Sequence, residues 1–174
     1  MRTKYWLGSA ILSYIAPEIK KFVLYALLRL YVEFKDAGRV LIAPYQMRLA
    51  KSGREPDVLF IAKENLARLG SQYLSGPADL AVEVVSPESR GRDRRDKLRE
   101  YQDAGVREYW IIDPIRREAE FYSLGADGVY QALATGPDGI FRSPVLSGLW
   151  LSVNWLWEDP LPKLRVIWKA WGLS

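Results

Sequence analysis

The chain has 174 residues, of which 49% are hydrophobic and 26% are charged, and it contains neither cysteine nor histidine. These absences exclude disulfides, zinc sites built from Cys or His, and nucleophiles activated by histidine. The formal net charge of +4 favours an anionic partner such as nucleic acid, and length and composition fit one domain over residues 1–174.

Residues 1–16 form an apolar N-terminal segment that the pattern leaves unassigned. Arg2 and Lys4 precede an apolar stretch as in a signal peptide, but no small-x-small cleavage site follows. No apolar run reaches the roughly 18 residues that a transmembrane helix needs. Because the lack of cysteine also fits a reducing compartment, we expect a cytoplasmic protein with no membrane partner.

An amphipathic helix is predicted over residues 17–37. Its apolar residues recur at i, i+3 and i+4: Ile19, Phe22, Val23, Ala26, Leu27, Leu30, Tyr31 and Phe34. Pro17 fits the first turn of this helix, and Gly38 fits the position after its last turn. We expect the apolar stripe to cover one face of a sheet.

Short strands, a helical turn and a second helix follow along the chain. Strands are predicted over 39–43, 45–49, 57–62, 79–86, 107–113, 118–124 and 129–134, with a polar loop over 51–55, a helical turn over 63–70 and a second helix over 92–104. Residues 158–174 form a tail with Trp168 and Trp171 that has no predicted place. The strand–helix–strand passage over residues 79–113 is typical of a right-handed crossover. The predicted fold class is therefore α/β, with a mixed sheet flanked by helices.

Two acids stand out against this background. Glu83 lies inside the aliphatic run Leu80-Ala81-Val82-Glu83-Val84-Val85, and Asp57 opens the strand that follows Pro56. A carboxylate in a buried strand costs several kcal/mol unless a partner compensates it. A divalent cation shared by both acids is one such partner, and oxygen ligands suit Mg²⁺ or Mn²⁺.

Lys97 is the third candidate. It shares a helix face with Asp93 and Tyr101, because the three are spaced by four residues. A helix that packs back on the sheet through a short connection would bring Lys97 toward Glu83. An ammonium there would stabilise negative charge that develops on a phosphate.

These residues resemble a known family. Pro56-Asp57 followed by Glu83 is similar to the PD-(D/E)XK nuclease signature, and the block from Asp79 to Pro114, with Glu83-Val84-Val85-Ser86-Pro87 and Tyr109-Trp110-Ile111-Ile112-Asp113-Pro114, resembles the Uma-type putative restriction endonucleases. The resemblance spans about residues 43–157. It departs from the signature at Val85, where the lysine is expected, and at the apolar N-terminus.

The resemblance implies a restriction-endonuclease-like core and a Mg²⁺-dependent endodeoxyribonuclease (with Mn²⁺ as the alternative ion) that hydrolyses the phosphodiester bonds of DNA. Asp57 and Glu83 would bind the metal, and Lys97, relocated to the helix, would complete the catalytic set. The alternative is a catalytically inactive, nuclease-like module that binds nucleic acid or protein. A homodimer formed through the Trp-rich end is a further expectation.

Each candidate also has a purely structural interpretation. Glu83 would pair with an arginine, Asp57 would cap the start of its strand, and Lys97 would form a surface pair with Asp93. Arg92, Arg94 and Arg95 are candidates for contact with DNA phosphates, although interleaved acids are typical of a solvated helix face.

Overall fold

A six-stranded mixed sheet forms the centre of the structure, a computed structural model that describes residues 4–86, 92–158 and 160–173. Side chains are described from Pro17 onward and, in the second helix, from Arg95 onward. The strand order is β1 (Gly38–Ile42), β4 (Val58–Ala62), β6 (Leu80–Val84), β7 (Glu108–Asp113), β8 (Glu118–Leu124) and β9 (Tyr130–Ala132). Only β6 and β7 pair in parallel within this sheet, which confirms the predicted mixed α/β class.

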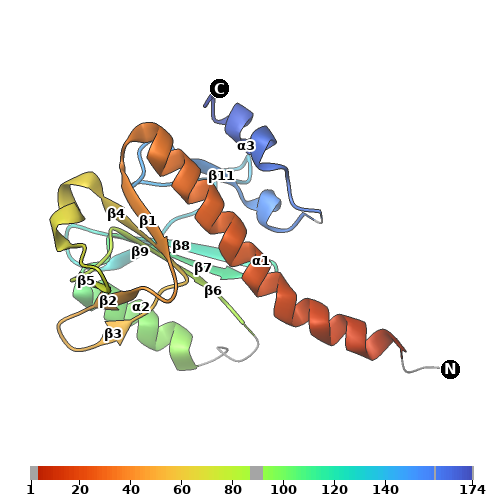
Figure 1. Cartoon of the computed structure of the whole chain (residues 1–174), viewed down its shortest axis with the longest axis horizontal. Helices are drawn as coiled ribbons and strands as arrows, with labels where there is room; N and C mark the ends of the chain where they lie inside the picture. Colours follow the sequence, from red (N-terminus) through yellow and green to blue (C-terminus); the bar gives the residue numbers. More distant parts are fainter. Residues whose placement is uncertain (1–3, 87–91, 159, 174) are drawn as a thin grey trace.

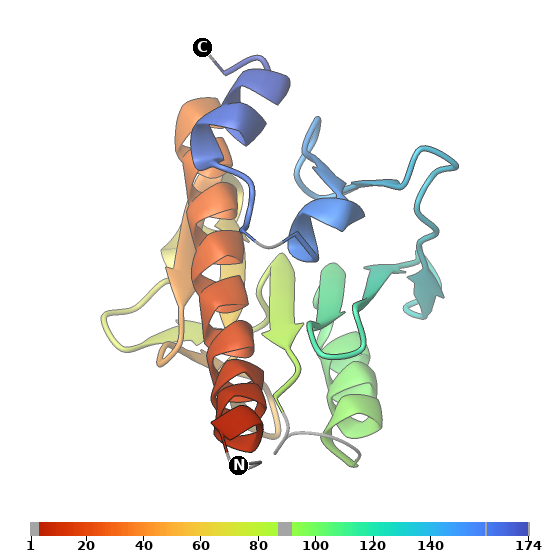
Figure 2. The same ribbon diagram turned by 90° about the vertical axis from the view of Figure 1, so that its right-hand side faces the viewer.

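The central strands have apolar residues on both faces because both faces are covered. Strand β4 is buried at all of its positions, and Glu83 is the one position of β6 that is not fully buried. Helix α1 (Lys4–Lys35) crosses one face, and helix α2 (Arg92–Ala104) lies on the other (Figures 1 and 2). Two separate apolar clusters result, one on each side of the sheet.

Helix α1 begins at Lys4, so the prediction that it starts at Pro17 was wrong. Pro17 lies inside the helix, and the N-terminal half of the ribbon extends beyond the sheet (Figure 1). Proline marks the first turn of many helices, but it ends a helix only when the lost hydrogen bond is not compensated by neighbouring structure. The pattern could not show that the helix continues upstream.

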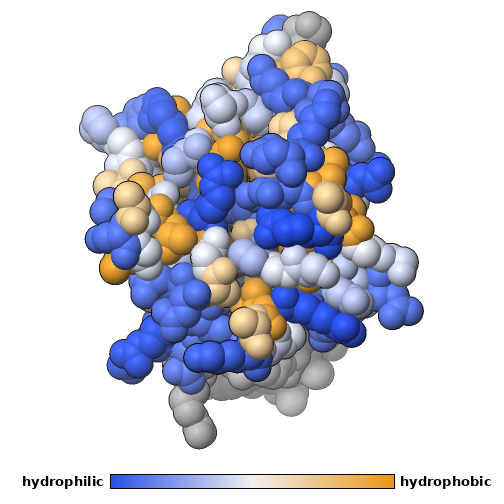
Figure 3. Space-filling model, turned by 90° about the vertical axis from the view of Figure 1, so that its left-hand side faces the viewer, coloured by the Kyte–Doolittle hydropathy of each residue, from blue (hydrophilic) through white to orange (hydrophobic). Residues whose placement is uncertain are grey.

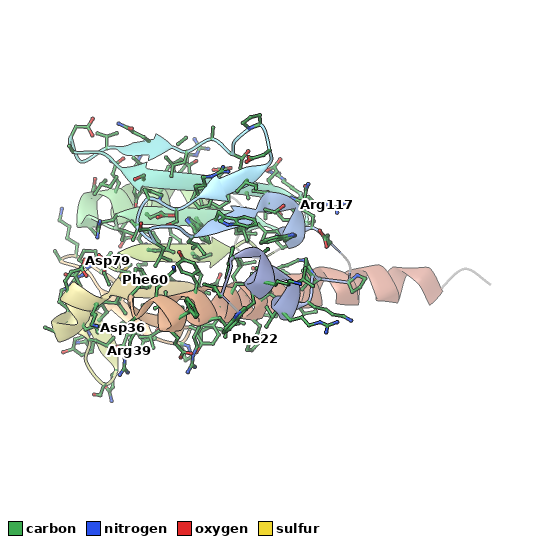
Figure 4. All side chains as sticks on the ribbon, turned by 90° about the horizontal axis from the view of Figure 1, so that it is seen from above. Phe22, Asp36, Arg39, Phe60, Asp79 and Arg117 are labelled. Atoms are coloured by element: carbon green, nitrogen blue, oxygen red, sulfur yellow. The ribbon has the colours of Figure 1, made fainter. Side chains whose placement is uncertain are left out.

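The buried face of α1 also differs from the predicted stripe. Phe22 and Phe34 are 64% and 51% exposed, whereas the residues packed on the sheet are Leu24, Leu27, Leu28, Tyr31 and Val32. Figure 4 shows Phe22 on the outer side of α1 and Phe60 of β4 between the sheet and the helix. Because this helix is apolar almost all the way round, spacing alone does not select the face that packs.

The end of α1 is built by Asp36 rather than by Gly38. Asp36 has a left-handed φ of 49°, and its amide donates to Glu33 O while the Ala37 amide donates to Val32 O. This hydrogen-bond pattern is a Schellman motif, in which the residue after the last turn is left-handed. Gly38 is already in β1, where an added Cβ would lie 2.0 Å from the carbonyl oxygen of Ile61.

Shorter elements surround the central sheet. A three-stranded sheet contains β2 (Gln46–Arg48), β3 (Gly53–Arg54) and β5 (Tyr73–Ser75), and a hairpin contains β10 (Ile140–Arg142) and β11 (Trp150–Ser152). Three helices complete the described elements: η1 (Lys63–Arg68), η2 (Val153–Leu156) and α3 (Leu164–Ala170). Strand β3 falls in the predicted polar loop and β5 was not predicted, because strands this short depend on their partners and not on local pattern.

The tryptophans at the C-terminal end are partly buried against the core. Those that pack against the cluster beneath α1 are Trp155, Trp157, Trp168 and Trp171. The indole N–H of Trp171 donates to Trp150 O at 2.8 Å, and its ring meets Tyr31 of α1 edge to face. The Trp-rich end is therefore packed on the fold and only partly exposed, and a homodimer formed through it stays a prediction.

Glu108 fastens this C-terminal region to the sheet. Its carboxylate is fully buried and accepts hydrogen bonds from Trp110 Nε1, Ser143 Oγ and the amide of Val145. Burial raises the pKa of Glu108, and the three donors oppose that shift.

The outer surface is polar over the face next to β2, β3 and β5. Figure 3 shows mainly hydrophilic residues there, with apolar residues in small separate areas. In the part of the chain that the structure describes, no helix has the length and apolarity needed to cross a membrane.

Candidate functional site

Asp57 is held in place at the start of β4. Strands β4 and β6 pair antiparallel with Val58 opposite Val82, which brings Asp57 beside Glu83. The Asp57 Oδ2 atom accepts a 2.7 Å hydrogen bond from the backbone amide of Val84, and its side chain is 15% exposed. The carboxylate is therefore oriented by β6 and is not merely a cap on its own strand.

Glu83 projects from β6 toward α2. Alternation along the strand puts it on the same face as Ala81, which packs in the cluster beneath α2. Its side chain is 12% exposed, and burial raises the pKa of this carboxyl above its usual range. Lys97 opposes the increase, whereas the nearby negative charge of Asp57 adds to it. The two carboxylates are thus close enough to repel each other.

Lys97 reaches Glu83 as the sequence geometry suggested. Its Nζ lies 3.2 Å from Glu83 Oε2, and its side chain is 19% exposed. In Figure 2, the arrowhead of β6 points between α1 on one side and α2 on the other. Lys97 is thus a largely buried partner of Glu83, in place of the arginine that was considered, and the side chain of Asp93, its alternative partner, lies outside the described residues.

Tyr101, one turn after Lys97, completes the contacts of Glu83. Its hydroxyl donates to Glu83 Oε1 at 2.7 Å, and burial raises the tyrosine pKa so that the proton stays on the hydroxyl. The adjacent Glu100 accepts hydrogen bonds from Arg54 of β3 and from Ser52, and its pKa is lowered chiefly by the Arg54 bond. These bonds fix α2 to the three-stranded sheet and so hold Lys97 and Tyr101 against Glu83.

Sequence reasoning missed Lys21 and Glu18 on α1. The Lys21 Nζ atom lies 3.1 Å from Asp57 Oδ1 and 2.7 Å from Glu18 Oε1. Partial burial alone would lower the pKa of Lys21, but the two carboxylates outweigh it and the pKa is raised. The sequence offered only a weak signal, the i, i+3 spacing of the two charges, because nothing local shows that α1 crosses beside Asp57.

The acid pair suits a divalent cation, although the described residues contain no group of three or more acids arranged as a metal cage. Asp57 and Glu83 supply hard oxygen donors. Burial is the main cause of the raised Glu83 pKa, and the repulsion by Asp57 that adds to it is what a cation bound by both acids would relieve. Mg²⁺ commonly binds through one or two carboxylates and keeps several water ligands. The donor chemistry therefore fits Mg²⁺ or Mn²⁺.

Other candidates fall elsewhere or outside the described residues. The side chains of Arg92 and Arg94 lie outside the described part of α2, whereas Arg95 is exposed on it. Asp79 accepts hydrogen bonds from the Ala62 amide and Asn65, and Figure 4 shows it at the end of the molecule where α1 finishes. Asp79 therefore has a structural role just before β6, whereas Glu83 lies near the other end of that strand. Asp113 accepts hydrogen bonds from the backbone amides of Ile115 and Arg116, as a turn-forming aspartate does.

Comparisons with known proteins agree with this architecture. A family named Uma2, described as "Putative restriction endonuclease", has a model that matches residues 18–154. Comparison with curated proteins found no match. Among solved structures, one described as a putative nuclease belonging to DUF820 from Anabaena variabilis is similar, with a TM-score of 0.69 and 16% identity over 81% of this chain and 79% of that chain. At that identity, the likeness shows the fold.

Proposed function

The chain belongs to the Uma2 family of restriction-endonuclease-like proteins, and on this premise we propose that it is a metal-dependent nuclease hydrolysing the phosphodiester bonds of DNA at Asp57 and Glu83. One observation carries the proposal. Two carboxylates from neighbouring strands lie together in a largely buried site, and the ammonium of Lys97 contacts one of them. A buried acid pair of this kind costs stability and calls for a functional reason.

The protein groups divide the work of hydrolysis. A Mg²⁺ or Mn²⁺ ion held by Asp57 and Glu83 would supply a Lewis acid and an activated water. The Val84 amide orients Asp57, and the Tyr101 hydroxyl orients Glu83. Lys97 places a positive charge beside Glu83, where it stabilises negative charge developing on the phosphate.

DNA as substrate is also a proposal. The net charge of +4 favours a polyanion, and exposed Arg95 on α2 is the described member of the arginine set with Arg92 and Arg94. Phosphate contacts of this type supply affinity without sequence information. Binding should therefore weaken steeply with salt and depend little on base sequence.

Plasmid cleavage tests the proposal. We expect the wild type to nick supercoiled DNA in Mg²⁺ or Mn²⁺ and to lose this activity in EDTA. Asp57→Asn and Glu83→Gln should each reduce cleavage by at least about 100-fold, because each removes a charged ligand. Glu64→Gln is the control, since Glu64 is exposed on η1 beyond the far end of β4.

Circular dichroism of each variant would confirm that the fold is retained. Full cleavage by folded Glu83→Gln would refute the role of that carboxylate. Cleavage that persists in EDTA would refute metal dependence.

A non-catalytic interaction module is the second candidate function. Val85 stands where the PD-(D/E)XK signature has its lysine, and its side chain is partly buried among apolar residues of the α2 side. This candidate predicts DNA binding without Mn²⁺ binding or cleavage. Calorimetric titration with Mn²⁺ in the absence of DNA separates the two functions.

A further inference from the structure

Lys21 occupies an unusual position between an exposed acid and a site acid. Its ammonium lies 2.7 Å from Glu18 Oε1 and 3.1 Å from Asp57 Oδ1. The Glu18 side chain is 60% exposed, whereas those of Lys21 and Asp57 are 20% and 15% exposed. Lys21 therefore contacts an exposed acid, Glu18, and a largely buried site acid, Asp57, at the same time.

The two oxygens of Asp57 have different partners. Oδ2 accepts a hydrogen bond from the backbone amide of Val84, so its position is fixed by β6. Oδ1 faces the ammonium of Lys21. A divalent cation that binds Asp57 through Oδ1 must share this oxygen with a positive charge or displace it.

Lys97 and Lys21 are not equivalent. Lys97 comes from α2, which is fixed to β3 through Glu100, and it contacts Glu83. Lys21 comes from α1 and has an alternative partner on its own helix, since Glu18 is one turn away. Loss of the contact with Asp57 would still leave the Lys21 ammonium paired and partly solvated.

We propose that Lys21 is an exchangeable counter-ion of Asp57. Without a divalent cation it neutralises Asp57 and reduces the repulsion between Asp57 and Glu83. When a cation binds at Oδ1, the ammonium leaves Asp57 and stays with Glu18. This inference rests on the proposed metal-dependent function, and it assigns to α1 a control of cation affinity that the acid pair alone does not provide.

Mn²⁺ binding to the full-length protein, measured by calorimetry without DNA, tests the exchange. Lys21→Met and Lys21→Gln should each bind Mn²⁺ about tenfold more tightly, the order expected when one charge a few ångströms from a divalent ion is removed in a solvated site. Lys63→Met is the matched control, because Lys63 pairs with Asp36 on the surface, and its affinity should equal that of the wild type. The use of two Lys21 variants guards against a folding defect in one of them.

Thermal unfolding gives a second readout. In EDTA, both Lys21 variants should melt below the wild type, because the two carboxylates lose a neutralising charge. Saturating Mn²⁺ should raise their melting temperatures by more than it raises that of the wild type. A purely structural lysine would lower the melting temperature equally with and without the ion.

Glu18→Gln tests where the ammonium goes. It should weaken Mn²⁺ binding several-fold in the wild-type background and clearly less in Lys21→Met, because Lys21 is the described residue that pairs with Glu18. Equal weakening in both backgrounds would overturn the transfer to Glu18. Unchanged or weaker binding by both Lys21 variants, with normal wild-type binding, would overturn the exchange and leave the nuclease proposal standing. No Mn²⁺ binding by the wild type would overturn both proposals.

Discussion

The hydroxyl of Tyr101 is the sharpest place to perturb the site, because Tyr101→Phe removes one atom and keeps the ring. Tyr101 is fully buried and packs edge to face on Tyr109, with ring centroids 4.9 Å apart. Its hydroxyl donates to Glu83 Oε1 at 2.7 Å. The substitution therefore preserves packing and leaves a buried carboxylate oxygen without this donor.

The expected cost follows from the charge and burial of the acceptor. A hydrogen bond to a charged group contributes about 1.5–3 kcal/mol to the free energy of unfolding. For a chain of this size, each 1 kcal/mol lowers the melting temperature by about 2–4 °C. We therefore expect Tyr101→Phe to destabilise the metal-free protein by about 2 kcal/mol and to lower its melting temperature by about 4–8 °C.

The cost should depend on pH with a definite sign. Burial raises the pKa of Glu83, while Lys97 and the Tyr101 hydroxyl lower it. The hydroxyl therefore stabilises the ionised form of Glu83, and its loss should cost most at pH values above the Glu83 pKa. The cost should shrink as pH falls through that pKa and Glu83 takes up a proton.

Urea denaturation of wild type and variant at a series of pH values, from alkaline to acidic, measures this difference. Tyr122→Phe is the matched control, because Tyr122 belongs to the same aromatic group but donates to Glu120 on β8. Its cost should be below about 1 kcal/mol, since that acceptor is only partly buried. A cost of Tyr101→Phe that stays constant across the pH series would refute the assignment of its hydroxyl to ionised Glu83.

Two further substitutions test the charge at the site and the fold that positions it. Lys97→Met should reduce metal-dependent DNA cleavage by about 100–1000-fold with Mn²⁺ binding retained, as calorimetry and plasmid nicking would show; full cleavage would rule out charge stabilisation by Lys97. Gly38→Ala should destabilise by at least about 2 kcal/mol in urea, because the new Cβ would lie 2.0 Å from Ile61 O. Gly128→Ala, whose Cβ meets no atom within 4 Å, should cost less than Gly38→Ala, and equal costs would contradict the predicted clash.

The sequence predicted the centre of the fold because the relevant signals are local. Continuous apolar runs indicated β4, β6 and β7, and the second helix predicted over residues 92–104 matches α2. Glu83 was identifiable for the same reason, since a carboxylate within a buried strand requires a partner whatever the rest of the fold. Spacing by four residues then placed Lys97 and Tyr101 on one face of α2, and both contact Glu83. Their catalytic and metal-binding roles stay predictions.

Only the tertiary structure decided how α1 packs. Its sequence is apolar almost all the way round, so several faces could be buried, and the crossing of the helix over the sheet selects Leu24 and Leu28 instead of Phe22. The same crossing brings Lys21 to Asp57, 36 positions later in the chain. The local pattern shows which residues avoid water. A contact between distant segments depends instead on the angle and register at which whole elements pack, and for this reason the sequence did not reveal Lys21 as the second lysine of the site.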